Sequence, residues 1–450
     1  MSHVSLHGLS VIVSEDNCLT DAATLTAFSV DGLVPQCAVF PRSEDEVARV
    51  LKRAAECGLA VIPCRNATKL GVGGIPRRYD VALSLKNLSE IRRFEPADLT
   101  VSAGPGIELA DFQRLLQPDR LWLPLDPPGA GRATLGGIVA ANASGPLRLK
   151  YGAPRDFVLG MRVATPDGRI IKTGGQVVKN VAGYDLSRLL TGSYGTLGVI
   201  VEISLKLFPL SAARASWKAR VPDLNVAHEL RRRILQSPLG PSRMVLLDGG
   251  AAAFARGNAP ESSDGVEGGF EIWMEFSGSD RVLARCAQTL GELAQAAGVA
   301  TEALAEGIAS AGWDRIADAS FLLSEHCENL IAVRVTLPIA SSEGFVELVT
   351  GEAKKHGMRS ACFCQNGVGI VRACLMPKDF DLGLATVITR LRAQAAERGG
   401  ALVIERCPSE MKKHVDVWGS VGSDFTLMHK LKELWDPKGT LSPGRFVGGL

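Results

Sequence analysis

Two segments dense in small residues constrain the fold of this 450-residue chain more than any other feature. One reads PCRNATKLGVGG, residues 63–74, and the other reads GAGRATLGGIVAANASG, residues 129–145. Each follows a predicted strand or extended segment. Consecutive backbone N–H groups in such turns form a concave anion site, and two opposed sites would suit a diphosphate. Two tight turns without a ligand would have the same composition, so the residues alone leave both interpretations open.

The two most familiar nucleotide-binding loops do not occur in the sequence. Several G-x-G tripeptides are present, but none extends to G-x-G-x-x-G, and G-x-x-x-x-G-K is absent. A Rossmann dehydrogenase and a P-loop enzyme are therefore both disfavoured. If a diphosphate is bound, Asn66 tolerates the left-handed backbone that the first segment needs, and Thr68 and Lys69 add a hydroxyl and a cation. Thr134 would cap a helix whose N-terminus faces the same diphosphate.

Length and composition exclude several classes of protein. A chain of 450 residues exceeds one ordinary domain, so two or three domains are expected. The formal net charge of +2 gives no support for nucleic-acid binding, and no apolar stretch predicts a membrane span. The N-terminus has no basic leader, which predicts no secretory signal and a cytoplasmic protein. The 10 scattered cysteines, without a C-x-x-C pair, predict reduced thiols and no iron–sulfur cluster.

The pattern of helices and strands predicts an α+β protein. Ser43 and Glu46 form a capping box for a helix that ends at Gly58, and short apolar strands follow it. A hairpin is expected with its turn at residues 166–168. After Pro209 further strand and helix patterns predict a second α+β domain. The predicted parts are an N-terminal segment at 1–33, a first domain at 34–210, a second at 211–430 and a tail at 431–450.

Three stretches carry a family resemblance: residues 41–74, 126–210 and 435–449. They resemble the FAD-binding fold of the vanillyl-alcohol oxidase type, also called the PCMH type. The segments VKNVAGYDL, residues 178–186, and GSYGTLG, residues 192–198, are most similar to FAD-binding subunits of bacterial glycolate oxidase complexes. The resemblance implies a two-part FAD-binding domain followed by an α+β cap domain, with the tail packing back on the first.

The resemblance also implies which residues bind FAD. The implied contacts are Arg65, Asn66, Ala67, Thr68, Lys69 and Leu70 in the first loop, then Pro128, Thr134, Leu135, Gly136, Gly137, Asn142, Ala143, Ser144 and Gly145 in the second, and Gly198, Val199, Ile200 and Val201 along the cofactor. The family's first loop has glycines where this chain has Asn66 and Ala67, which predicts weaker binding. Neither loop contains the histidine or cysteine that usually forms a covalent bond, so non-covalent FAD is expected.

The implied chemistry is hydride transfer from an alcohol carbon to the flavin, which needs a base and a cation for the substrate carboxylate. Arg334 falls where such arginines lie in related hydroxyacid dehydrogenases, although an exposed strand residue is an equal interpretation. Those relatives supply the base with clustered histidines and often a metal. The corresponding strand here, CFCQNGVGIVRACLM, has no histidine, and the later segment has only His414. Arg334 and His414 are thus the catalytic candidates, and no metal site is predicted.

The implied function is that of a flavoprotein subunit of a glycolate oxidase-like complex acting on a small 2-hydroxy acid. Its partners would be a larger FAD-linked subunit and an iron–sulfur subunit, which would supply the base and the cluster. Through them the chain would lie at the inner face of the cell membrane. The alternatives are a self-contained FAD-dependent dehydrogenase for another hydroxyacid or alcohol, and a scaffold subunit with a weakened FAD site.

A few other positions admit a functional and a structural role. Arg155 matches an arginine of the relatives, and its structural role would be to pair with a neighbouring carboxylate or carbonyl. Lys179 would approach the flavin. Tyr184 would lie beside the flavin or pack in the interior, with Asp185 capping the next helix. Arg445 would anchor the tail.

Overall fold

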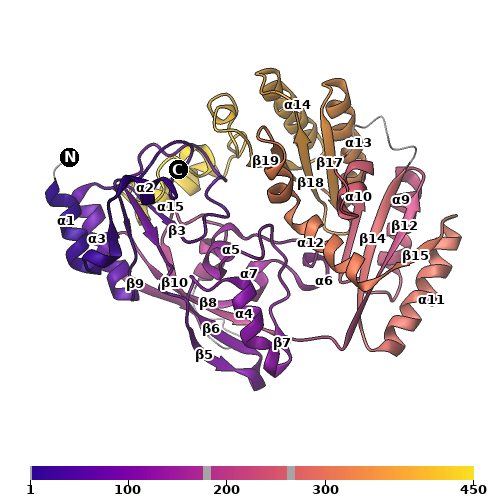
Figure 1. Ribbon diagram of the computed structural model, residues 1–450, viewed down its shortest axis with the longest axis horizontal. Coiled ribbons are helices and arrows are strands. Elements are labelled where there is room, and N and C mark those ends of the chain that lie inside the picture. The colour runs from indigo at the N-terminus through magenta and orange to yellow at the C-terminus, as the bar shows by residue number, and fades with distance from the viewer. Residues whose placement is uncertain (1–2, 176–183, 261–268) are drawn as a thin grey trace.

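The computed structural model describes residues 3–175, 184–260 and 269–450. The N-terminal half, with both chain termini, lies beside a C-terminal half built on one large sheet (Figure 1). Both halves combine helices with sheets, which confirms the expected α+β class. Lys179 lies outside the described ranges. No helix within those ranges is long and apolar enough to cross a bilayer.

The first sheet supports the loop of residues 65–74. Its strand order is β1-β2-β4-β3, with β4 parallel to both β2 and β3. The helix α3 connects β2 to β3, and Ser43 caps it by accepting the N–H of Glu46 at 3.2 Å. The Glu46 carboxylate accepts from the N–H of Arg42, one residue before the expected partner. The elements are α1 His3–Val13, β1 Cys18–Leu19, α2 Ala22–Thr26, β2 Cys37–Val39, α3 Glu44–Cys57, β3 Val61–Cys64 and β4 Val81–Ser84.

The second sheet has the order β5-β6-β10-β8-β9 and is antiparallel throughout. The predicted hairpin is β8 and β9, and Gly168 adopts a φ of 84° in its turn. After β10 the chain forms a short separate strand, β11, which ends at Pro209 and pairs with β7. The elements are β5 Ile91–Glu95, β6 Thr100–Ala103, α4 Leu109–Leu116, β7 Leu121–Trp122, α5 Leu135–Ala141, α6 Arg148–Tyr151, α7 Pro154–Phe157, β8 Val158–Ala164, β9 Ile170–Gly174, α8 Leu186–Leu190, β10 Val199–Lys206 and β11 Phe208–Pro209.

The cap is an 8-stranded antiparallel sheet of order β15-β12-β14-β13-β17-β18-β16-β19. Its strands are β12 Ala213–Val221, β13 Arg243–Leu247, β14 Phe270–Gly278, β15 Thr301–Leu304, β16 Ile331–Thr336, β17 Arg359–Gln365, β18 Ile370–Met376 and β19 Ala401–Arg406. Its helices are α9 Leu224–Gln236, α10 Gly249–Ala255, α11 Asp280–Ala296, α12 Glu306–Leu322, α13 Ile339–Lys355 and α14 Gly383–Glu397.

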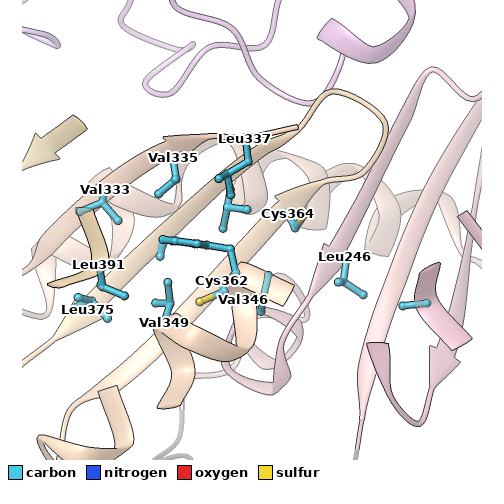
Figure 2. Close-up of a cluster of buried hydrophobic side chains, with 14 of the residues drawn as sticks. Leu246, Val333, Val335, Leu337, Val346, Val349, Cys362, Cys364, Leu375 and Leu391 are labelled. Atoms are coloured by element: carbon cyan, nitrogen blue, oxygen red, sulfur yellow. The ribbon is translucent and has the colours of Figure 1, made fainter. Parts of the chain in front are cut away.

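Side-chain alternation gives the cap sheet two different faces. Val333, Val335 and Leu375 point into a core shared with Val349 of α13 and Leu391 of α14, as Figure 2 shows. The opposite face packs on α10 and α12 over part of its area. Because successive strand residues alternate in direction, the residues between these valines and leucines must lie on that opposite face. That face therefore holds the polar residues of β16 and β18.

The tail returns to the first domain and joins its first sheet. After α15, Phe425–Trp435, the N–H of Val61 donates to the carbonyl of Thr440 at 2.7 Å. The carbonyl of Val61 accepts from the N–H of Ser442 at 2.9 Å. At the end of α15, the Lys432 ammonium binds the Asp436 carboxylate at 2.7 Å, and the Asp436 side chain has no exposed surface. A buried ion pair thus fixes the turn that starts the tail.

We predict that Lys432→Met destabilises the protein by about 3–5 kcal/mol, because it leaves the Asp436 charge buried and unpaired. Denaturant unfolding monitored by fluorescence measures this change. Lys430→Met, on an exposed position of the same helix, is the matched control and should change the unfolding free energy by less than about 0.5 kcal/mol. A double variant, Lys432→Met with Asp436→Asn, should recover much of the loss, and no recovery would contradict the explanation.

Candidate functional site

A cavity lies in the first domain, between the first loop, α5 and the start of β10. All six predicted first-loop residues line it. Six residues predicted from the second loop and from the stretch along the cofactor also line the cavity: Thr134, Gly136, Gly137, Gly198, Val199 and Ile200. The remaining predicted residues do not line it: they are Pro128, Leu135, Asn142, Ala143, Ser144, Gly145 and Val201. Tyr194, Ser442 and Arg445 line it without having been predicted as cofactor contacts.

The first loop offers backbone donors to this cavity. Within the described chain, the N–H groups of residues 66–69 donate to no protein acceptor. Ala67, and not Asn66, adopts the left-handed conformation, with a φ of 59°. The expectation that Asn66 supplies this conformation is wrong. The Asn66 amide instead donates to Glu108 Oε1 at 2.7 Å and to the carbonyl of Arg132 at 2.8 Å, which holds the two loops together.

The start of α5 uses its backbone donors inside the protein. Thr134 is the N-cap, as predicted, and its hydroxyl accepts the N–H of Gly137 at 3.3 Å. The N–H of Leu135 donates to Ile107 and that of Gly136 to Pro105, at 3.0 and 2.9 Å. These three groups are therefore not free for the diphosphate that the sequence placed at this helix end. A side chain at Gly136 would bring its Cβ within 2.6 Å of Pro105, so glycine is required for packing.

The first residues of the second loop contact the cap. The N–H of Gly129 donates to Asp318 Oδ1 of α12 at 2.6 Å. A Cβ at Gly129 would lie 3.1 Å from the ring of Phe321, on the same helix. Burial raises the pKa of Asp318, while the hydrogen bond from Gly129 lowers it. A carboxylate of the cap thus occupies the donors at this end of the loop, and these residues serve to join the two domains.

The polar face of the cap sheet carries a pair of arginines. Arg334 of β16 and Arg372 of β18 are direct cross-strand partners, and like charges in that position are unfavourable. Glu405 of β19 compensates them, with contacts of 3.2 Å to Arg334 and 3.4 Å to Arg372. Burial opposes ionisation of Glu405, but Arg372, Lys69 and Arg334 outweigh it and hold its pKa at about 2. Arg372 also donates to the carbonyl of Ser144 at 2.8 Å, across the domain boundary.

Two cavity residues face this cluster. Burial lowers the pKa of Lys69 to about 8; Glu405 opposes the change, and Arg372 is among the cations that add to it. Burial raises the pKa of Tyr194 to about 12, and its ring packs edge-on against Trp418 with centroids 5.0 Å apart. Lys69 also lines a second, neighbouring cavity together with Glu405, and Glu405 contacts both arginines of the cluster. The sequence signal for Arg372 was a charged residue inside an otherwise apolar strand, whereas Glu405 stands beside Arg406 at the end of its strand.

The other candidates lie apart from the cavity or serve the fold. His414 is half-exposed and lies 3.7 Å from Glu410 on the surface, so it is not brought to the site. Tyr184 is 94% exposed, which contradicts the expectation that it packs. Asp185 caps α8 as predicted, accepting the N–H of Arg188 at 3.1 Å.

The remaining two arginines also have structural contacts. The backbone N–H of Arg155 donates to Asn142 Oδ1 at 3.3 Å, in place of the expected pairing by its side chain. The Arg445 guanidinium donates to the carbonyls of Leu70 and Val72, which shapes the first loop from the tail.

Family models and solved structures agree with this geometry. Residues 35–174 match the model described as FAD binding domain, and residues 210–446 match FAD linked oxidases, C-terminal domain. The p-cresol methylhydroxylase structure superposes with a TM-score of 0.79 at 14% identity, covering 98% of this chain and 96% of that one. This confirms the PCMH-type fold.

Curated relatives include enzymes and subunits. Glycolate oxidase subunit GlcD of Bacillus subtilis is 27% identical over 423 residues, 92% of this chain and 89% of that protein. Glycolate oxidase subunit GlcE of Escherichia coli is 38% identical over 203 residues, 45% of this chain and 55% of that protein. D-2-hydroxyglutarate dehydrogenase of Stutzerimonas stutzeri is 31% identical over 204 residues, 44% of each.

We predict opposite effects for substitutions at the two unusual loop positions. Ala67→Gly removes roughly 1 kcal/mol of left-handed strain and should leave stability unchanged or raise it. Asn66→Gly loses both hydrogen bonds of the Asn66 amide and should cost about 1–2 kcal/mol. Denaturant unfolding of the two variants measures the difference. A stabilised Asn66→Gly protein with a destabilised Ala67→Gly protein would contradict the loop conformation.

Proposed function

This chain belongs to the FAD-linked oxidases, and we propose that it uses FAD to oxidise the CH–OH group of a 2-hydroxy acid to the 2-oxo acid. The proposal depends on two features: a loop with free backbone N–H groups, and a pair of arginines on the cap sheet. Free backbone N–H groups of the first loop suit an anionic cofactor. The compensated arginine pair of the cap, Arg334 and Arg372, suits a small carboxylate beside it.

The residues around the cavity fit the diphosphate of FAD. Besides the free N–H groups of residues 66–69, the Ser442 hydroxyl and Arg65 Nε are buried without a partner in the described structure. Buried polar atoms are usually paired, so such atoms favour a bound polar ligand. We infer that the first loop, Arg65 and the tail hold the diphosphate. We expect no covalent bond, because burial raises the pKa of the lining thiol Cys64 to about 12 and disfavours the thiolate.

Bound FAD supplies the acceptor for the hydride of the substrate carbon. The residues of this chain bind and orient the acid. Arg334 and Arg372 would bind the carboxylate, and Glu405 would keep both guanidinium groups in place. The Tyr194 hydroxyl, protonated at neutral pH, would donate a hydrogen bond to the substrate or the flavin edge.

We predict that Arg334→Met raises KM for the 2-hydroxy acid roughly 10- to 150-fold, as expected for loss of about 1.5–3 kcal/mol of charged hydrogen bonding. Steady-state kinetics of flavin turnover with an artificial acceptor measures KM and kcat separately. Arg281→Met, at an exposed position of α11, is the matched control and should behave like the wild type. Unchanged KM in Arg334→Met would remove this arginine from carboxylate binding.

The more specific part of the proposal is that the chain is a subunit of a glycolate oxidase-like complex. The similarity to GlcD and GlcE supports it. Affinity purification of the tagged chain from its host should retain a larger FAD-linked protein and an iron–sulfur protein in constant ratio. A chain that elutes alone with full 2-hydroxy acid dehydrogenase activity would instead identify a self-contained dehydrogenase. A chain that elutes with partners but without flavin would identify a scaffold.

A further inference from the structure

The side chain of Gln365 is a buried polar group that no contact described so far explains. It lies at the end of β17, is 4% exposed, and its Oε1 has no hydrogen-bond partner among the described residues. Buried polar atoms are nearly always paired, because an unpaired one costs its full desolvation energy. An unpaired carboxamide oxygen in the interior therefore favours a ligand that completes it. The inference that follows rests on the proposed function.

Strand register places Gln365 on the face of the cap sheet that carries the arginine pair. Cys364, the residue before it, points into the core that α13 and α14 cover (Figure 2), so Gln365 points to the opposite face. Phe363, two residues earlier and on that same face, is the direct partner of Arg372. Arg372 is in turn the direct partner of Arg334. Gln365 is thus the diagonal neighbour of Arg372, at a separation that long side chains can span.

Contacts with the first domain border this part of the sheet. Arg372 donates to the carbonyl of Ser144 at 2.8 Å. Gly367 follows Gln365 in the turn after β17, and a Cβ at Gly367 would lie 2.8 Å from Leu149 Cδ1 of α6. Both contacts are made by residues 144–149 of the first domain. Gln365 therefore lies at the boundary between the two domains, beside the arginines that would bind the substrate carboxylate.

An amide oxygen beside two guanidinium groups matches the polar groups of a 2-hydroxy acid. The carboxylate accepts hydrogen bonds from arginines, whereas the hydroxyl, one carbon away, donates one and needs an acceptor. Glu405 is already held by both arginines, at 3.2 and 3.4 Å, but Gln365 Oε1 is free. A neutral acceptor also has the advantage that it does not compete with the substrate carboxylate for the two positive charges.

We propose that Gln365 is the residue that recognises the C2 hydroxyl of the substrate. With the carboxylate on Arg334 and Arg372, the hydroxyl donates its hydrogen bond to Gln365 Oε1. An acid without the hydroxyl binds the same arginines and leaves Oε1 unpaired. The preference for 2-hydroxy acids over unsubstituted acids therefore comes from this buried acceptor, because the arginines bind both classes alike.

The test compares ligands that differ only by the hydroxyl group. The FAD-loaded chain is reduced with dithionite under anaerobic conditions, so that no acid is oxidised, and binding is measured by isothermal titration calorimetry. The pairs are glycolate and acetate, D-lactate and propionate, and D-2-hydroxyglutarate and glutarate. In the pair that fits the site, the wild-type chain should bind the hydroxy acid about 5- to 150-fold more tightly than its partner.

Two variants remove the acceptor in different ways. Gln365→Met keeps a similar volume without the amide, so it should bind both members of the pair alike, with the affinity for the unsubstituted acid unchanged. Gln365→Asn keeps an amide in the sheet but withdraws it by one methylene, and it should lose most of the preference. Gln288→Met, at an exposed position of α11, is the matched control and should keep the wild-type preference. A wild-type preference in either Gln365 variant would overturn the inference.

Stability without any acid gives an independent measurement. Gln365→Met removes an unpaired buried oxygen, so its thermal unfolding midpoint should equal or exceed that of the wild type. Addition of the hydroxy acid should then raise the midpoint of the wild type more than that of the variant. A variant that is less stable than the wild type and gains equally from the hydroxy acid would show that the carboxamide serves the fold.

Failure of this inference and failure of the proposed function give different results. If a 2-hydroxy acid reduces the oxidised flavin while the Gln365 variants keep the hydroxyl preference, the oxidation stands and another group recognises the hydroxyl. If no pair binds and no 2-hydroxy acid reduces the flavin, with or without co-purified partners, the proposed function fails and this inference fails with it.

Discussion

The guanidinium group of Arg445 is the contact on which the cofactor cavity depends. It donates to the carbonyls of Leu70 and Val72, which lie on the first loop 375 and 373 residues earlier in the chain. The N–H of Gly74 returns a bond to the carbonyl of Arg445 at 3.0 Å. These bonds hold the carbonyls of Leu70 and Val72 toward the tail, beside residues 66–69, whose N–H groups have no protein acceptor among the described residues. A distant part of the chain thus helps to shape the first loop.

The cap sheet shows how an unfavourable local arrangement indicates a site. Two arginines directly opposite on neighbouring strands repel each other, and a neutral pair would stabilise the sheet better. The buried Glu405 offsets only one of the two charges. Real proteins retain such conflicts mainly at functional positions, where the ligand completes the charge balance. A carboxylate bound beside Arg334 and Arg372 would do so here.

Local features of the fold could be predicted from the sequence, and pairings between distant segments could not. The capping of α3 by Ser43, its end at Gly58, and the β8–β9 hairpin follow from neighbouring residues. The first loop was predicted to be a cofactor site, and its left-handed conformation was assigned to Asn66 because that residue type tolerates φ above zero. In the structure the Asn66 amide makes tertiary hydrogen bonds, and Ala67 adopts that conformation. Arg334 could be predicted as a candidate by itself. Its pairing with Arg372 could not, because it depends on the register of β16 against β18.

The pairing of the tail with the edge strand β3 of the first sheet has a consequence for the order of synthesis. Residues 65–70 leave the ribosome long before Ser442 and Arg445, and the whole cap is made in the interval. Until the tail has paired with Val61, one wall of the cavity is missing. The complete cavity can therefore form only after the cap has been translated, and a nascent chain exposes the edge of β3 throughout that time. Any chaperone that protects this protein during synthesis would be expected to cover that edge first.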